Sequence, residues 1–247
     1  MSRMSAAIGA ALVLVAAPMA RGAHPLINED PGTQGAGKFE LELGFAAVRG
    51  DPPGGRSMEL GPQLSYGATD TLDLIVRPSW NSIRAPGEER VRGAGDTAVD
   101  VKWRFFERDD FQLGLRAGVD FPTGDADRGL GAGKAGANAL LAFAANAAGA
   151  QWLANLGDAY ARADGERRHR PFVSVGVLVP AEGTLRASLE VAAQANADRD
   201  RSTWPAVARA GFLWQASETW SFDLGAEGRL NRAAPSFTAL VGATLRW

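Results

Sequence analysis

Several kinds of residue are scarce in this chain of 247 residues: it has no cysteine, two histidines, two tyrosines and a formal net charge of −2. Without cysteine no disulfide can hold the fold together, so hydrogen bonding and packing must do so. The nearly balanced charge argues against nucleic acid as a partner, because such binding depends on an excess of cations. Past the N-terminus no apolar run approaches the roughly 20 residues that a membrane helix needs. The sequence therefore argues against a mature helical membrane protein.

The N-terminus has the three parts of a secretory signal peptide. Arg3 provides a short basic region, residues 6–17 form an apolar core, and Pro18 and small residues follow. A core of this length is typical of a signal peptide and is too short to span a membrane as an anchor. We predict a signal peptide over residues 1–23 with cleavage near Ala20 or Ala23, although neither site fits the small-residue preference well.

From Lys38 to Trp247 the chain alternates between apolar and polar residues, in segments of about ten residues that match a membrane-spanning strand. A period of two indicates strands with two unlike faces. The first and last segments show it clearly. Their apolar positions are Phe39, Leu41, Leu43 and Phe45, then Phe237, Ala239, Val241, Ala243, Leu245 and Trp247. In the Ala-rich segments 137–148 and 151–160 the phase of the alternation is ambiguous.

Short and long connections alternate along the chain. The short ones are 67–70, 107–110, 147–150, 180–183 and 215–218, and the longer ones include 50–56, 81–95, 122–136, 161–170 and 195–202. Bacterial outer-membrane barrels have short periplasmic turns and longer extracellular loops, which would place both ends of the barrel in the periplasm. A soluble β-sandwich would also alternate, but it explains neither the loop lengths nor the regular strand length. We therefore predict an all-β fold, a transmembrane antiparallel up-and-down β-barrel of about 12 strands over residues 38–247, in the bacterial outer membrane.

The polar strand faces would line the interior of this barrel, and they carry charges of both signs in nearly equal number. Such a lining predicts either a polar conduit or an interior closed by salt bridges. About twelve strands lies between small filled barrels and wide porins, so a narrow pore, or one blocked by an inward segment, fits the size. The residues predicted to line the lumen are Arg77, Asp100, Lys102, Arg104, Arg116, Asp120 and Glu190.

Enzyme chemistry has little support in the sequence. Nucleophilic catalysis of the kind found in outer-membrane phospholipase A needs a His within hydrogen-bond reach of a Ser. His24 lies beside the cleavage region and His169 in a predicted loop, so neither falls in a predicted strand. The carboxylates of Asp109 and Asp110 lack the Gly and the distal Glu of a calcium loop. We predict no catalytic residue, no cofactor and no metal site.

Three stretches carry a recognisable pattern: residues 24–42 read HPLINEDPGTQGAGKFELE, residues 95–105 read GDTAVDVKWRF, and residues 121–125 read FPTGD. They resemble the "HPL…EDTGTQG.G…ELE" opening, the "GD…lK" strand and the "PTGD" strand exit of the meta-pathway of phenol degradation family. Pro31 stands where that family's opening has Thr. The resemblance covers most of the mature chain. It implies an outer-membrane, transporter-like β-barrel that passes aromatic or other hydrophobic compounds, and it carries over no catalytic residue.

Together these patterns predict an outer-membrane channel for passive diffusion of small solutes, and the alternative is a structural or surface-binding barrel with a closed lumen. Residues 24–37 are predicted either to fold into the lumen as a plug or gate or to form a periplasmic leader. The expected partners are the solutes, outer-membrane lipid and lipopolysaccharide. The basic residues 167–170 are either a candidate site for lipopolysaccharide phosphates or, as the favoured interpretation, a solvated loop. The barrel-assembly machinery is a further partner, with Trp247 as the signal that it reads.

Overall fold

The computed structural model describes residues 24–51, 53–162 and 165–247, so the predicted signal peptide, residues 1–23, lies outside the described residues. Nearly all of the regular structure is β-strand, and one short 3-10 turn, η1 (Ala126–Arg128), follows β7. Within these ranges no helix is long and apolar enough to cross a membrane. The strands are β1 (Phe39–Arg49), β2 (Arg56–Thr69), β3 (Leu72–Arg77), β4 (Trp80–Arg84), β5 (Val91–Ala94), β6 (Thr97–Arg108), β7 (Phe111–Phe121), β8 (Gly136–Ala147), β9 (Ala150–Tyr160), β10 (His169–Val179), β11 (Leu185–Gln194), β12 (Ala206–Gln215), β13 (Trp220–Arg229) and β14 (Phe237–Arg246).

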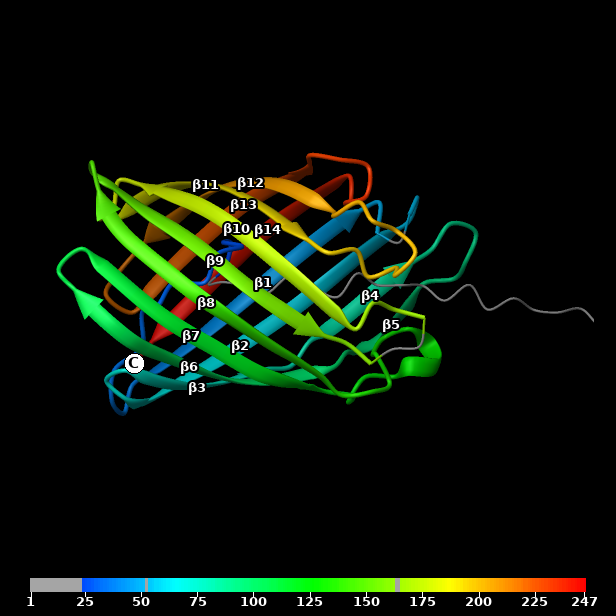
Figure 1. Ribbon diagram of the computed structural model, residues 1–247, viewed down its shortest axis with the longest axis horizontal. Helices are drawn as coiled ribbons and strands as arrows, with labels where there is room; N and C mark the ends of the chain where they lie inside the picture. Colours follow the sequence, from blue (N-terminus) through cyan, green and yellow to red (C-terminus); the bar gives the residue numbers. More distant parts are fainter. Residues whose placement is uncertain (1–23, 52, 163–164) are drawn as a thin grey trace, which may run out of the picture.

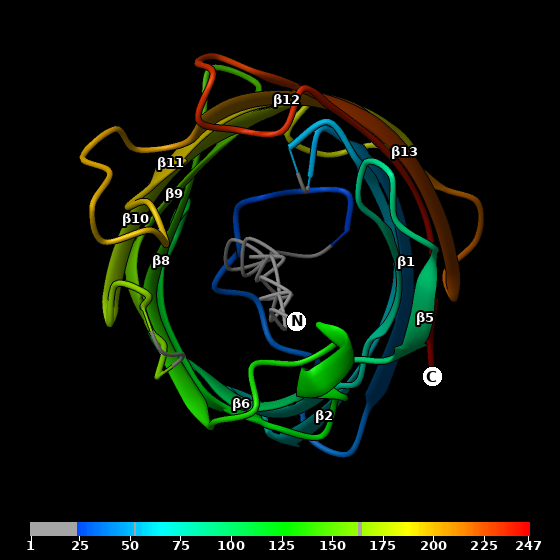
Figure 2. The same cartoon turned by 90° about the vertical axis from the view of Figure 1, so that its right-hand side faces the viewer.

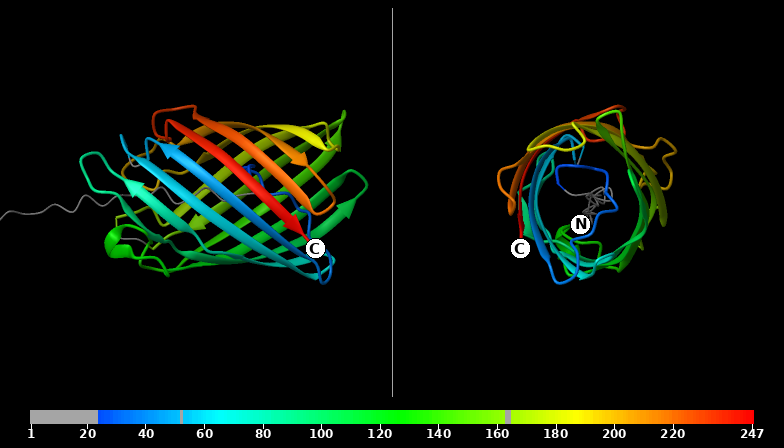
Figure 3. Two further views of the ribbon diagram at one scale, coloured as in Figure 1. Left: turned by 180° about the vertical axis from the view of Figure 1, so that it is seen from behind. Right: turned by 90° about the vertical axis from the view of Figure 1, so that its left-hand side faces the viewer.

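One antiparallel sheet closes on itself to form a barrel (Figure 1). Consecutive strands pair from β6 to β14, and β1 pairs with both β2 and β14. The closing register places Glu40 opposite Arg246 and Arg49 opposite Phe237, and Figure 3 shows β14 alongside β1. Closure pairs the backbone groups that an open sheet would leave at its edges, as a wall in lipid requires. The predicted all-β, up-and-down barrel is confirmed.

Along two of the twelve paths that the chain takes across the wall, the strand is interrupted and counts as two strands. The fourteen strands therefore form a 12-stranded barrel with two extensions. β3 and β4 pair with successive parts of β2 on either side of Pro78, and β5 and β6 make up the next path. Proline has no N–H to donate, which favours a break there. The Gly95 N–H still donates to the Ser79 carbonyl at 2.9 Å. The prediction of a connection over 81–95 was wrong in extent, because β4 and β5 leave only residues 85–90 between them.

The apolar strand faces point outward and the charged faces point inward. Leu156 and Leu224 on the outside are 61% and 58% exposed, whereas Asp100, Arg116 and Glu190 are only 1%, 2% and 1% exposed. A soluble protein has the opposite arrangement, with apolar side chains buried and charges in water. A wall that meets lipid on its outer face and polar groups on its inner face accounts for this pattern.

Aromatic side chains gather at the short-turn end, where the first and last strands meet. The ring of Phe39 lies 4.8 Å from that of Tyr66 and stacks on Trp247 with centroids 5.5 Å apart. Phe39 and Trp247 also exchange two backbone hydrogen bonds, of 2.9 and 3.1 Å. Rings at this height form the interfacial belt typical of membrane barrels. Trp247 thus completes the seam that closes the barrel.

Residues 24–37, which we call the inner segment, run inside the barrel before the chain enters β1. Seen end-on in Figure 2, the segment (dark blue) follows a curved path within the ring of strands. It joins the wall at the short-turn end, where the Gly37 N–H donates to the Gly67 carbonyl at 2.8 Å. Leu26 packs in one small apolar cluster of the inner wall and Ile27 in another. The centre of the barrel is therefore occupied by the chain's own N-terminal residues.

Candidate functional site

Glycines form the inner surface of the wall where the inner segment lies against it. A Cβ atom at Gly44 would lie 2.6 Å from the His24 ring, and one at Gly176 would lie 2.8 Å from Asn28 Nδ2. Glycine within a strand often marks such a close approach, because any side chain would collide with what lies there. The other inward glycines in contact with the segment are Gly67, Gly114, Gly211, Gly225 and Gly242. The wall is therefore shaped to accept the segment on several strands.

Glu29 is held by both its side chain and its backbone. Lys102 Nζ donates to Glu29 Oε1 at 3.0 Å, and the Arg116 guanidinium forms an ion pair with Oε2. Asn155 accepts the Glu29 N–H at 2.7 Å and donates to its carbonyl at 2.8 Å. Burial acts to raise the pKa of the Glu29 carboxyl, but Lys102 and Arg116 outweigh it and lower that pKa. Glu29 is therefore an anion between two cations, which we call the clamp (Lys102 and Arg116).

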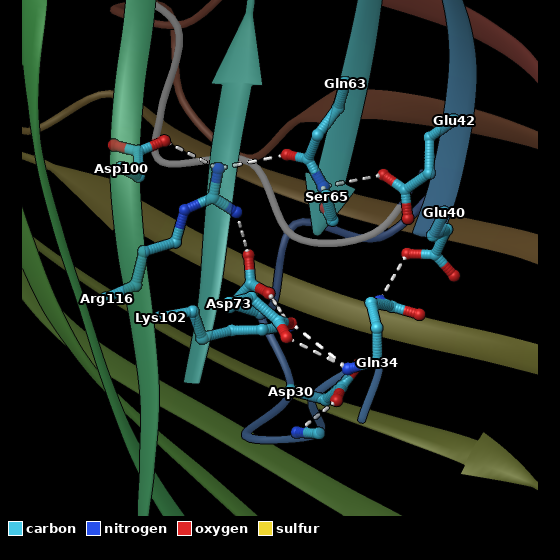
Figure 4. A network of polar contacts seen from close by, with 12 residues as sticks. Asp30, Gln34, Glu40, Glu42, Gln63, Ser65, Asp73, Asp100, Lys102 and Arg116 are labelled. Atoms are coloured by element: carbon cyan, nitrogen blue, oxygen red, sulfur yellow. Dashed lines mark hydrogen bonds and ion pairs between the residues drawn. The ribbon is translucent and has the colours of Figure 1, made fainter. Parts of the chain in front are cut away.

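The wall itself positions Arg116 of the clamp. Arg116 also donates to Asp100 at 2.8 Å and to Gln63 at 3.0 Å, as Figure 4 shows. Asp100 accepts a further hydrogen bond from Arg77 at 3.1 Å. A planar guanidinium fixed by two wall acceptors keeps its remaining N–H groups aimed into the lumen. Arg116 is thus held by groups that do not belong to the inner segment.

Glu190 on β11 anchors the residues that precede Glu29. Its carboxylate accepts the N–H groups of Ile27 at 2.8 Å and Asn28 at 3.0 Å, and it accepts the Asn28 side-chain amide at 2.8 Å. Ser174 donates to Asn28 Oδ1 at 2.8 Å. Asn28 is fully buried and Glu190 is 1% exposed. Backbone donors that would otherwise be orphaned in the lumen are satisfied by this one carboxylate.

Polar groups of the wall also hold the two ends of the inner segment. Arg209 donates to the Pro25 carbonyl at 2.8 Å, and His24 Nδ1 lies 2.6 Å from an Asp223 carboxylate oxygen. At the other end, Gln34 donates through its N–H to Asp73 and through its side-chain amide to Glu40, at 2.8 Å in the second case (Figure 4). The segment is therefore fastened along its length and to opposite sides of the barrel.

The residues predicted to line the lumen lie at four places in the barrel. Arg77, Asp100, Lys102 and Arg116 form one network around Glu29, and Glu190 forms the separate anchor described above. Arg104 lies at the short-turn end, where it donates to the Asp70 carbonyl at 3.1 Å and pairs with Glu107 at 3.3 Å. Asp120 lies near the long-loop end, opposite Ala98 and Gly136 on the neighbouring strands.

Some residues of the site were not predicted from the sequence. Asn155 lies in the Ala-rich strand β9, where the phase of the alternation was ambiguous. Ser174 and Gln63 are uncharged polar residues, of which the strands contain many. The inward glycines were the signal in the sequence that could have predicted a segment inside the barrel. They recur on the polar strand faces, where an empty lumen would not require the wall backbone to lie close to another part of the chain. The prediction that His169 lies in a loop was wrong, since it begins β10 and its Nδ1 lies 2.6 Å from Asp158.

Several solved β-barrels are similar to this structure, although no protein-family model and no curated protein sequence matches the chain. An outer membrane channel from Pseudomonas putida F1 aligns over 88% of this chain and 98% of its own, with a TM-score of 0.71 and 12% identity. The NanC porin aligns over 84% and 98% with a TM-score of 0.58, and the KdgM porin over 83% and 98% with 0.57, each at 8% identity. The fold is that of outer-membrane channels and porins. The resemblance to the phenol-degradation family is not confirmed and stays a prediction.

Proposed function

We propose that this protein is an outer-membrane channel for passive diffusion of small solutes and that the inner segment gates it. The observation that carries the proposal is the way the segment is held: its anchors are mostly hydrogen bonds and ion pairs to a polar wall, which water can replace. A barrel closed for strength alone would be better filled by apolar packing, since buried ion pairs add little net stability. The likeness to channels and porins in fold supports the same function.

The class of solute follows from the sequence resemblance, which points to aromatic or other hydrophobic compounds. Transport is diffusive, and the inner segment must move for a solute to pass the level of Glu29.

Outer-membrane lipid meets the exposed apolar belt, and the assembly machinery acts on the seam at Trp247. Lipopolysaccharide is a partner of the loop end. There Arg167 donates to the carbonyls of Asn196, Arg199 and Arg201. Arg170 is only 5% exposed, so Arg168 is the arginine of the predicted cluster that is open to a phosphate.

A reversible lock on the inner segment tests the gate. The chain has no cysteine, so a disulfide introduced by Pro31→Cys with Gly114→Cys would be the only one. A Cβ at Gly114 would lie 3.1 Å from Pro31 Cβ, and a shift of a few tenths of an ångström brings this to the roughly 3.5–4.5 Å of a disulfide. In planar bilayers we expect few openings in the oxidised variant and frequent openings after reduction. Equal conductance in the two states would refute gating by the segment.

The second candidate function is a structural or surface-binding barrel with a closed lumen, and the number of anchors on the inner segment favours it. Deleting residues 26–36 separates the two functions. A channel gated by the segment should conduct more after the deletion, and solutes should swell liposomes that contain it. If the unaltered protein and the deletion variant both assemble as heat-modifiable barrels and neither passes any solute, the channel function is wrong.

A further inference from the structure

The clamp brings two like charges together in the wall. Lys102 on β6 and Arg116 on β7 are direct cross-strand partners in the register of the sheet. Like charges in this position destabilise a sheet unless an anion lies between them. Lys102 is 7% exposed and Arg116 is 2% exposed, so water screens this repulsion little. The wall therefore contains a preformed site for one carboxylate, and Glu29 occupies it.

Apolar sites lie beside the clamp. The Leu26 side chain packs against Ala144, Leu153 and Leu178, and that of Ile27 packs against Ala192 and Val207. Leu26 is three residues from Glu29, and three residues span at most about 10 Å. Both apolar sites are filled by the same stretch of chain that places Glu29 in the clamp. Removal of that stretch would free a carboxylate site and two apolar sites within this distance.

We propose that the clamp binds carboxylate-bearing solutes with a short apolar body, and that such solutes open the channel by taking the place of Glu29. This inference rests on the proposed function, because the solute must reach the lumen. A carboxylate fits the clamp for the same reason that Glu29 does, since Arg and Lys donors form strong charge-assisted hydrogen bonds with it. An amide or an amine of the same shape places no anion between the two cations, and Arg116 then keeps its ion pair with Asp100.

Competition of this kind sets the concentration at which a solute acts. Glu29 is tethered to the wall through β1, and short tethers give effective concentrations in the millimolar range. A solute must therefore reach millimolar concentrations to compete with Glu29. It shifts the segment away from the wall only as far as it binds more tightly to the clamp without Glu29 than to the clamp with Glu29 in place. The apolar body adds affinity through the sites that Leu26 and Ile27 leave.

The experiment measures how often the inner segment leaves the wall. Leu26→Cys provides a reporter, because Leu26 is 5% exposed and the chain has no other thiol. The full-length variant in detergent micelles is treated with a water-soluble methanethiosulfonate, and the labelling rate is followed. Hexanoate, hexanamide, hexylamine and acetate are compared at equal millimolar concentrations. We expect hexanoate to accelerate labelling at least fivefold, acetate to act weakly, and the amide and the amine to have no effect.

Two further variants show whether the clamp is responsible. Adding Lys102→Met should abolish the difference between hexanoate and hexanamide. Adding Arg209→Gln, which loosens the segment at the Pro25 carbonyl and leaves the clamp intact, should raise the basal rate and keep the difference. Equal acceleration by hexanoate and hexanamide, or a hexanoate effect that survives Lys102→Met, would overturn the proposal. Labelling does not depend on ion flux, so a barrel that never conducts would refute the channel function without affecting this result.

Discussion

Replacing Glu29 by Gln should release the inner segment. The change keeps the shape of the side chain but removes the anion that lies between Lys102 and Arg116. Leaving a buried charge without its partner costs about 3–5 kcal/mol, and each 1.36 kcal/mol is a factor of ten in an equilibrium. The full cost would shift the docking equilibrium by roughly 160- to 4,700-fold. Water entering the vacated lumen hydrates the two cations, so we expect a smaller shift, about 100-fold.

Amide hydrogen exchange of the inner segment measures this shift directly. In the unaltered protein the N–H groups of Ile27 and Asn28 are bonded to Glu190 and that of Glu29 to Asn155, so they exchange only when the segment leaves the wall. Exchange of these three amides should become about 100-fold faster in Glu29→Gln, while exchange in the barrel strands stays unchanged.

Asp30→Asn is the matched control for this experiment. It removes a negative charge from the adjacent residue, which interacts with Lys102 through its charge but donates and accepts no hydrogen bond there. Among the described residues the Asp30 side chain accepts a local hydrogen bond from the Gly32 N–H at 2.6 Å, which an Asn oxygen can also accept. In the Asp30→Asn variant the same three amides should exchange at a rate within a few-fold of that in the unaltered protein. The reasoning fails if Glu29→Gln accelerates exchange by less than tenfold, or if Asp30→Asn accelerates it equally.

Three further changes test other parts of the structure. Gly44→Ala places a Cβ 2.6 Å from the His24 ring and should raise exchange of the segment at least tenfold, whereas Gly228→Ala, which meets open space, should not. Equal effects would contradict the role of the inward glycines in accepting the segment. Asp96→Ala removes the acceptor for the Gly124 and Ala132 N–H groups, at 2.9 and 2.7 Å, and should speed tryptic cleavage of the β7–β8 connection severalfold; an unchanged rate would contradict this anchor. Trp247→Asp should remove most of the heat-modifiable folded form from the outer membrane, and normal amounts would contradict its role in the seam.

The barrel wall could be predicted from the sequence because its environment has two sides. Lipid on one face and polar groups on the other impose an alternation that every wall strand must follow, so Val241 and Leu245 are apolar and Thr244 is not. The interrupted path at Pro78 escaped prediction for a related reason. β4 and β5 extend beyond the main wall, where the alternation is short and the surrounding glycine and proline are typical of a loop.

The inner segment could not be placed from the sequence, because it has no repeating pattern. Its fourteen residues form neither helix nor strand, and the wall residues that hold them are scattered along the chain from Glu40 to Asp223. Asn28, for example, is held by Glu190, 162 positions later. Contacts of this kind depend on the register of several strands at once. The resemblance to a family opening marked these residues as important but did not say where they lie.

The mixed charge of the inner wall, which left open whether the barrel is a conduit or a closed scaffold, has a specific cause in the structure. A polypeptide offers both N–H donors and C=O acceptors, so a wall that binds one needs anions and cations in turn. Asp73 and Glu190 accept backbone N–H groups of the segment, and Arg209 donates to a backbone carbonyl. The clamp differs from these contacts, since Lys102 and Arg116 bind a side-chain carboxylate. The clamp is therefore the part of the wall that a small anion can occupy without imitating a peptide, which makes it the point where a solute can compete with the gate.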